Sequence, residues 1–146
     1  MKIAIPLDKE LLLYTDNPFT APKFAIYLID GNKSDISYSL LNTVDNPLYI
    51  DECDIAYDKQ KLCACDDSCK NDIKHICEHY ALLEVISSCS YLLADKYCKN
   101  TLNSLKNGGI KIFRIPSIIK RTDIAIKNFL IGAFLASNIQ NITNAS

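Results

Sequence analysis

Cysteine and histidine side chains, the residues best suited to transition-metal chemistry, gather in one stretch of the chain, residues 62–79. It holds four of the seven cysteines and both histidines. Thiolate and imidazole groups are ligands for soft and borderline transition metals. Their spacing, C-x-C-x3-C-x7-C-x-H, differs from the paired C-x2-C of a zinc finger or ribbon. The pattern therefore indicates a metal or cluster site without specifying the metal.

A predicted helix limits how these residues can share one ion. Asp67 or Ser68 is a suitable N-cap, and apolar side chains follow at helical spacing. On that helix Cys69 and Cys77 are eight residues apart, or about 12 Å along the axis. Two ligands of one tetrahedral ion, with bonds of about 2.3 Å, cannot be that far apart. One ion therefore does not bind all four cysteines unless the helix begins after Cys69.

The preferred ligands come from a loop and the first helical turn. They are Cys63, Cys65 and Cys69, and they would hold a cluster or metal ion. Cys77 and His79 are the further candidate metal ligands. The positive end of the helix dipole would favour the thiolate form of a cysteine at this position.

Each candidate ligand also has a structural interpretation. Cysteine is among the most buried residue types, and Cys77 shares an apolar helix face with Ile73 and Tyr80. His75 and His79 are four residues apart on the opposite face, a spacing that can chelate a metal but is more typical of a solvated face. The three loop cysteines are equally compatible with surface or reactive thiols.

Composition indicates one soluble globular domain. The chain has 146 residues, 49% of them hydrophobic and 23% charged, with a net charge of −1. Acidic and basic residues are interspersed, which argues against a nucleic-acid partner. The longest apolar run, residues 129–136, is too short to span a membrane. Seven clustered cysteines without a signal peptide predict a cytoplasmic protein with reduced or metal-bound thiols.

Hydrophobic periodicity predicts an α/β fold with strands and helices in the order β-β-β-α-β-α-β-α. The predicted strands are residues 2–7, 23–29, 35–44, 91–94 and 111–115, and the helices are 67–87, 95–107 and 122–136. Asp30-Gly31-Asn32 is predicted as a hairpin turn, and Gly108-Gly109 as a helix stop. The order implies a mixed sheet with helices on both faces.

Two elements carry more detailed expectations. In the third strand Ile36, Tyr38 and Leu40 alternate with serine, which predicts one solvated face. The last helix is expected to turn six residues toward the sheet: Ile124, Ile126, Phe129, Leu130, Ala133 and Phe134. The domain is expected to span residues 1–136, with a cysteine-rich insertion at about 45–70 and a polar tail at 137–146.

Four segments, residues 1–6, 21–27, 89–94 and 105–113, resemble the dinitrogenase iron–molybdenum cofactor biosynthesis family, which includes NifX-like and NifY-like carriers. The resemblance covers nearly all of the chain outside residues 45–70. It implies a three-layer, ribonuclease-H-like fold with sheet order 3-2-1-4-5. It also implies binding of an iron–sulfur or iron–molybdenum cluster and its transfer between partner proteins, without catalysis.

The chain departs from that family where ligands are expected. Many members carry a His-Phe-Gly loop with a ligand histidine, and Asn17, Pro18 and Phe19 stand in its place here. A glycine pair after the fourth strand is replaced by residues 95–98. In one interpretation ligation has moved to the cysteines of the insertion. In the other, binding was lost and the domain only contacts partners.

The leading hypothesis is a cytoplasmic, non-enzymatic cluster carrier that meets cluster-donor and cluster-acceptor proteins but neither nucleic acid nor membrane; its oligomeric state is left open. The alternative is a metal-free interaction module whose cysteines are structural or redox-sensitive. The third hypothesis is an enzyme, either thiol-based or a two-metal nuclease built on acidic residues: Asp8, Asp30, Asp54 and Asp95.

Cys89, at the start of a buried strand, is predicted to be a packed, inert thiol.

Overall fold

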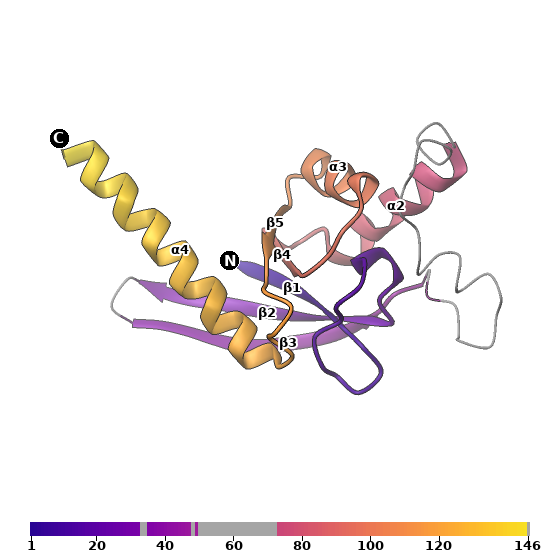
Figure 1. The fold of residues 1–146 in the computed structure, drawn as a ribbon, viewed down its shortest axis with the longest axis horizontal. Helices are drawn as coiled ribbons and strands as arrows, with labels where there is room; N and C mark the ends of the chain where they lie inside the picture. The colour runs from indigo at the N-terminus through magenta and orange to yellow at the C-terminus, as the bar shows by residue number, and fades with distance from the viewer. Residues whose placement is uncertain (33–34, 48, 50–72, 146) are drawn as a thin grey trace.

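The computed structural model describes residues 1–32, 35–47, 49 and 73–145, and their strands form a five-stranded sheet with the order β3-β2-β1-β4-β5 (Figure 1). The strands are β1 (Lys2–Leu7), β2 (Lys23–Asn32), β3 (Asp35–Asp45), β4 (Tyr91–Ala94) and β5 (Lys111–Arg114). The helices are η1 (Pro18–Thr20), α2 (Ile73–Ile86), α3 (Lys99–Asn107) and α4 (Thr122–Ala145). The predicted α/β class and mixed sheet order are confirmed.

β1 is the central strand, antiparallel to β2 and parallel to β4. Successive side chains of a strand point to opposite faces, and β1 is apolar on both. Ile3 and Ile5 join a buried cluster with Ile126 and Phe129 of α4. Ala4 joins a second cluster with Leu82 of α2, together with Leu105 of α3. The predicted covering of both faces is therefore confirmed.

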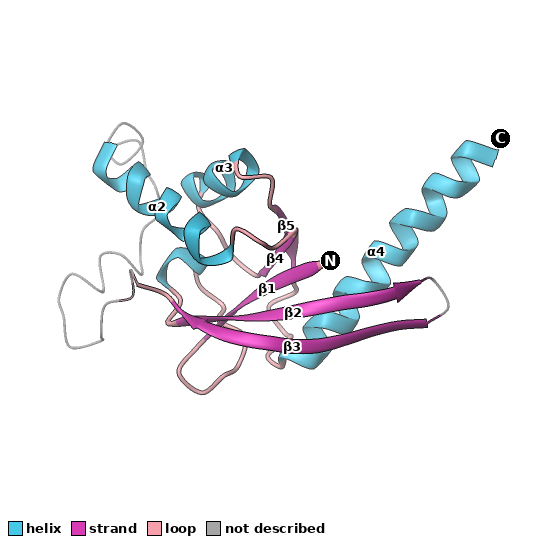
Figure 2. Ribbon diagram, turned by 180° about the vertical axis from the view of Figure 1, so that it is seen from behind, coloured by secondary structure: helices cyan, strands magenta, loops and turns pink. Residues whose placement is uncertain are grey.

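The pictures show the same layers. In Figure 1 α4 crosses in front of β2 and β3, and in Figure 2, seen from behind, these strands lie in front of α4. α2 and α3 lie together at the opposite side of the sheet. The two buried clusters thus fill the two spaces between three layers, which is how a sheet apolar on both faces is covered.

α3 begins later than predicted and ends as predicted. Its N-cap is Cys98, whose sulfur accepts a hydrogen bond from the Thr101 amide, so residues 95–98 are a loop rather than the first helical turn. At the other end Gly108 is the C-cap and Gly109 has a φ of 80°. The Ile110 amide donates to the Leu105 carbonyl at 2.8 Å, which closes a Schellman motif.

The β2–β3 hairpin extends further than predicted. Gly31 and Asn32 pair with Ile36 and Asp35, so they belong to the strand and the predicted turn is wrong by about one residue pair. The predicted solvated face of β3 is confirmed, since Ser37 and Ser39 are exposed. The apolar side chains beside them are exposed as well: Ile36 and Leu40 are 40% and 53% exposed, whereas Tyr38 packs partly buried against the core.

α4 continues to Ala145, beyond the predicted helix end at residue 136, so the helix includes residues 137–145 of the expected polar tail. Its terminal part projects away from the sheet (Figures 1 and 2). Ile126 and Phe129 are buried as predicted, with Leu130 and Ala133 packed against the same cluster. Ile124 is 44% exposed, contrary to prediction, because Ala125 takes the buried position. No helix in the described part of the chain is long and apolar enough to cross a membrane.

Candidate functional site

The structure describes the predicted ligands only in part. Cys63, Cys65 and Cys69 lie outside the described residues, as does the predicted first turn of the helix. Cys77 and His79 belong to α2, of which the backbone alone is described at these positions. Among the described residues no group of three or more histidine, cysteine, aspartate and glutamate side chains gathers as a metal site. The ligand set therefore remains a prediction.

The ends of the strands show where the cysteine-rich insertion leaves the domain. β1, β4 and β5 run parallel, so the loops that follow them open at one edge of the sheet, here called the carboxyl edge. Leu7 pairs with Lys23, and Lys23 pairs with Asp45, so β3 ends at the same edge. In open α/β sheets ligands bind outside the carboxyl ends of strands, where neighbouring connections diverge. The connections after β1 and β4 diverge in this way.

Asn17, which stands where the resemblance implies a ligand histidine, is buried in the protein at this edge. Its side chain is 7% exposed. Its Oδ1 accepts hydrogen bonds from Thr101 Oγ1 at 2.9 Å and from the Phe19 amide at 3.5 Å. Both bonds use the oxygen that a metal would need. Asn17 therefore caps η1 and joins it to α3, and its oxygen is not available as a ligand.

The same network includes Cys98. Its Sγ lies 3.1 Å from Thr101 Oγ1, the hydroxyl that donates to Asn17. The Thr101 amide donates to Cys98 Sγ at 3.4 Å. The buried sulfur thus caps α3, and this arrangement favours a capping role for Cys98 over a ligand role.

The insertion is anchored to this network at its first residues. Asn46 directly follows β3 and is 4% exposed. Its Nδ2 donates to the Phe19 carbonyl at 2.9 Å and to the Ala21 carbonyl at 2.9 Å, and its amide donates to the Pro22 carbonyl at 3.0 Å. η1 thus connects the start of the cysteine-rich insertion with the N-terminus of α3.

Three polar atoms at or near the carboxyl edge have no hydrogen-bond partner among the described residues: Asn17 Nδ2, Asp95 Oδ2 and Asn100 Nδ2. Asp95 directly follows β4, is 3% exposed, and accepts at Oδ1 from Ser117 Oγ at 3.3 Å. An unsatisfied buried polar group costs about 1–3 kcal/mol. The edge therefore has unused hydrogen-bonding capacity that a polar ligand can satisfy.

Among the described residues, the acidic residues considered for a two-metal site do not gather as a group of three. Asp8 and Asp95 follow neighbouring parallel strands at the carboxyl edge, but Asp30 lies away from them. Asp8 Oδ1 accepts from the amides of Glu10 and Leu12 at 2.8 and 3.0 Å, which closes the loop after β1. Asp30 Oδ1 accepts from the Gly31 amide at 2.8 Å, near the hairpin end of β2. Asp8 and Asp30 therefore lie toward opposite ends of the sheet. Asp54 lies outside the described residues.

Cys89 is buried as predicted. It is 5% exposed and packs with Leu92 and Ile110 in the cluster beneath α2 and α3. Burial raises the pKa of its thiol, an effect that a hydrogen bond with Ser88 and the charge of Lys2 only partly oppose. A raised pKa lowers the thiolate fraction, and the thiolate is the reactive form.

Sequence reasoning missed the Asn17–Thr101 hydrogen bond, which joins residues 84 positions apart, and the burial of Asp95. The sequence held a local signal only for Cys98. This residue lies three positions before Thr101, which is the spacing between an N-cap residue and the backbone amide that donates to its side chain.

Comparison with protein-family models, curated proteins and solved structures returned no match for this chain. Function is therefore inferred from the fold and the residues themselves.

Proposed function

We propose that this chain is a ribonuclease-H-like cluster carrier that binds an iron–sulfur or iron–molybdenum cluster through Cys63, Cys65 and Cys69 and passes it to a partner protein. The observation that carries the proposal is the sheet order β3-β2-β1-β4-β5 with β1 at the centre. This is the order that the resemblance to the cofactor biosynthesis family implies.

The geometry of the carboxyl edge supports cysteine ligation in place of histidine ligation. Asn17 is buried and its oxygen already accepts two hydrogen bonds. The cysteine-rich insertion starts beside it, held by Asn46 through η1. Soft thiolate ligands suit iron–sulfur clusters, and a loop mounted on a rigid sheet can release its cargo without unfolding the domain.

The experiment is anaerobic reconstitution of the full chain with ferrous iron and sulfide, followed by visible absorption. We expect charge-transfer bands that a Cys63→Ser, Cys65→Ser, Cys69→Ser triple variant loses. A Cys89→Ala, Cys98→Ser double variant is the matched control, because both of these thiols are buried in the protein, and it should keep the bands. Thermal melts of the metal-free proteins check that each variant folds.

The results of this reconstitution distinguish where a cluster binds from whether the chain binds one at all. A folded triple variant that retains the bands would move the site to other cysteines, with Cys53 and Cys77 tested next. A wild-type chain that takes up no cluster would refute the carrier proposal.

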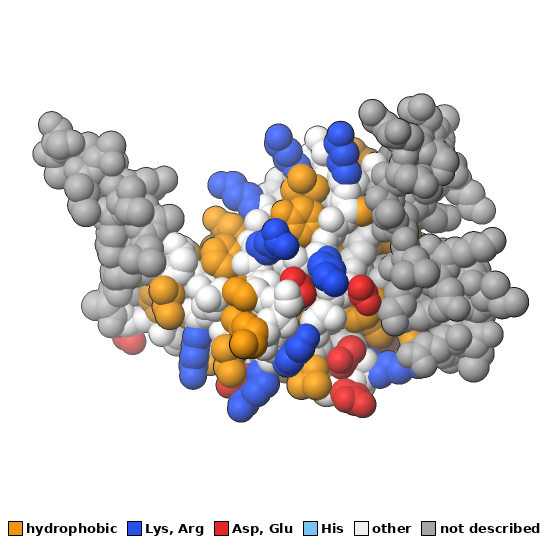
Figure 3. Space-filling view, viewed as in Figure 1, with side chains coloured by type: hydrophobic (Ala, Val, Ile, Leu, Met, Phe, Trp, Pro, Cys, Tyr) orange, Lys and Arg blue, Asp and Glu red, His pale blue; other side chains and the backbone are white. Residues whose placement is uncertain are grey.

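The second candidate function is a metal-free interaction module, and exposed apolar side chains favour it. Leu11, Leu12 and Ile118 are 56%, 38% and 86% exposed, and the loops that hold them are joined by a bond from the Leu13 amide to the Lys120 carbonyl at 2.8 Å. Leu11 has a φ of 65°, an uncommon conformation for leucine. Apolar side chains also reach the surface between charged ones on the face seen in Figure 3. Failure of cluster uptake would leave this function.

A further inference from the structure

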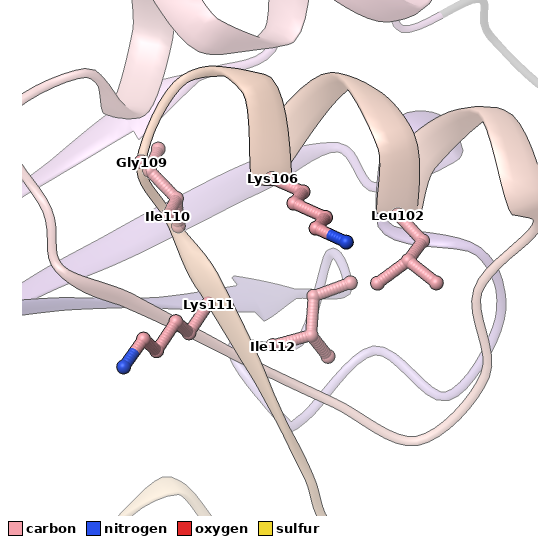
Figure 4. A pocket seen from close by; sticks show the side chains of 6 residues that line it. All are labelled: Leu102, Lys106, Gly109, Ile110, Lys111 and Ile112. Atoms are coloured by element: carbon pink, nitrogen blue, oxygen red, sulfur yellow. The ribbon is translucent and has the colours of Figure 1, made fainter.

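A hollow of about 440 Å³ lies between α3 and β5, at the edge of the sheet. Its lining residues are Leu102, Lys106, Gly109, Ile110, Lys111 and Ile112. The side chains of Leu102 and Lys106 descend from α3 toward Ile112, whereas that of Lys111 extends away from them (Figure 4). The hollow thus has an apolar floor and a cation at its mouth, and it lies apart from the carboxyl edge loops.

The strand beside the hollow has one unpaired edge. Among the described residues β5 pairs with β4 alone. The amides of Lys111 and Ile115 donate to the carbonyls of Ser90 and Ala94 at 3.1 and 2.8 Å, so the backbone groups of Lys111 and Ile115 face β4. In a parallel strand successive residues direct their N–H and C=O groups alternately to the two sides, so every second residue directs them outward. Ile112 and Arg114 therefore present hydrogen-bonding groups to an incoming strand.

Charge decides which kind of strand fits. Lys106, Lys111 and Arg114 are all exposed. Residues 99–115 contain no aspartate or glutamate. Pairing of two copies through β5 would therefore bring a second basic strand against this one, and neighbouring like charges are destabilising. The edge therefore disfavours self-association and favours an acidic partner.

We propose that the β5 edge and its hollow bind an extended, acidic segment of a partner protein by strand addition. An apolar side chain of the segment fills the hollow over Ile112, and the carboxylates adjacent to it in sequence point to the opposite face of the strand, where they meet Lys111. Main-chain hydrogen bonds to Ile112 and Arg114 supply affinity, and the hollow and the cations supply specificity. This role does not depend on cluster binding.

The test titrates the isotope-labelled full chain with a capped peptide of about eight alternating valine and glutamate residues, the length of a typical added strand, followed by NMR. The largest amide shifts should occur at Ile112 and Arg114, with intermolecular cross-strand contacts. A Lys111→Glu variant should bind about two- to fivefold more weakly, as expected for the loss of one exposed ion pair. Lys127→Glu, an exposed charge change on α4, is the matched control and should bind normally.

Two further probes make the result decisive. The same peptide, with the backbone N-methylated on the pairing side, cannot form the ladder and should not bind. Equal binding of the methylated peptide, or of a short aliphatic carboxylate, would overturn the proposal and assign the hollow to a small amphiphile. An absence of binding, or shifts centred on β3, would also overturn it.

Discussion

Replacing Asn46 by alanine should destabilise the protein more than the size of the residue suggests. Its Nδ2 donates to two carbonyls, those of Phe19 and Ala21, each at 2.9 Å, and the side chain is 4% exposed. The substitution leaves two buried acceptors without this donor. Since an unsatisfied buried group costs about 1–3 kcal/mol, the expected loss is about 2–4 kcal/mol in the free energy of unfolding.

Urea denaturation of the metal-free chain measures this loss, and a thermal melt should show a midpoint lower by roughly 10 °C. Asn46→Asp should be at least as destabilising, because a carboxylate cannot donate to either carbonyl. Asn42→Ala, on the exposed surface of β3, is the matched control and should change stability by less than about 0.5 kcal/mol. An Asn46→Ala variant as stable as the control would refute the claim that this residue anchors the insertion to η1.

Three further predictions concern single residues. Cys98→Ser should leave stability within about 0.5 kcal/mol, because serine is a preferred N-cap, whereas Cys98→Ala should cost about 1 kcal/mol in urea denaturation; equal effects would contradict the capping role. Gly109→Ala should cost only about 1 kcal/mol for its positive φ, since nothing lies within 4 Å of the added carbon, but Gly31→Ala should cost several times more because that carbon would lie 1.8 Å from the Asp35 carbonyl oxygen. Burial raises the pKa of the Cys89 thiol above its ordinary 9.0. The contribution of this thiol to the free energy of unfolding is therefore present below pH 9.0 and declines as the pH rises further. The difference in unfolding free energy between the wild type and Cys89→Ala should narrow above pH 9.0, and a difference that stays constant would contradict this prediction.

The sheet was predictable because its signals are local. The apolar run of β1 and the short apolar run of β4 each identify a strand buried on both faces. The end of α3 was equally clear, since Gly108 and Gly109 carry the stop signal in the sequence itself. In β3 the sequence is apolar on one side only. The exposure of Ile36 and Leu40 there depends on packing neighbours that the sequence does not show.

The errors and omissions arise from tertiary contacts. The start of α3 is set by Cys98 and Thr101 together with Asn17, which is distant in sequence, so a helix start predicted at residue 95 was too early. The extent of the hairpin depends on pairing between Asn32 and Asp35. At the candidate site the role of Asn46 is likewise fixed by carbonyls of η1 rather than by its own neighbours in the chain.

The cluster content of the anaerobically purified full chain tests the central claim most directly. Iron and acid-labile sulfide should be present in near-equal amounts, or with molybdenum besides iron, at a fixed ratio to protein. Both should fall to background in the Cys63→Ser, Cys65→Ser, Cys69→Ser variant while the Cys89→Ala, Cys98→Ser control retains them. A wild-type chain that contains neither iron nor sulfide after anaerobic purification and reconstitution would contradict the account.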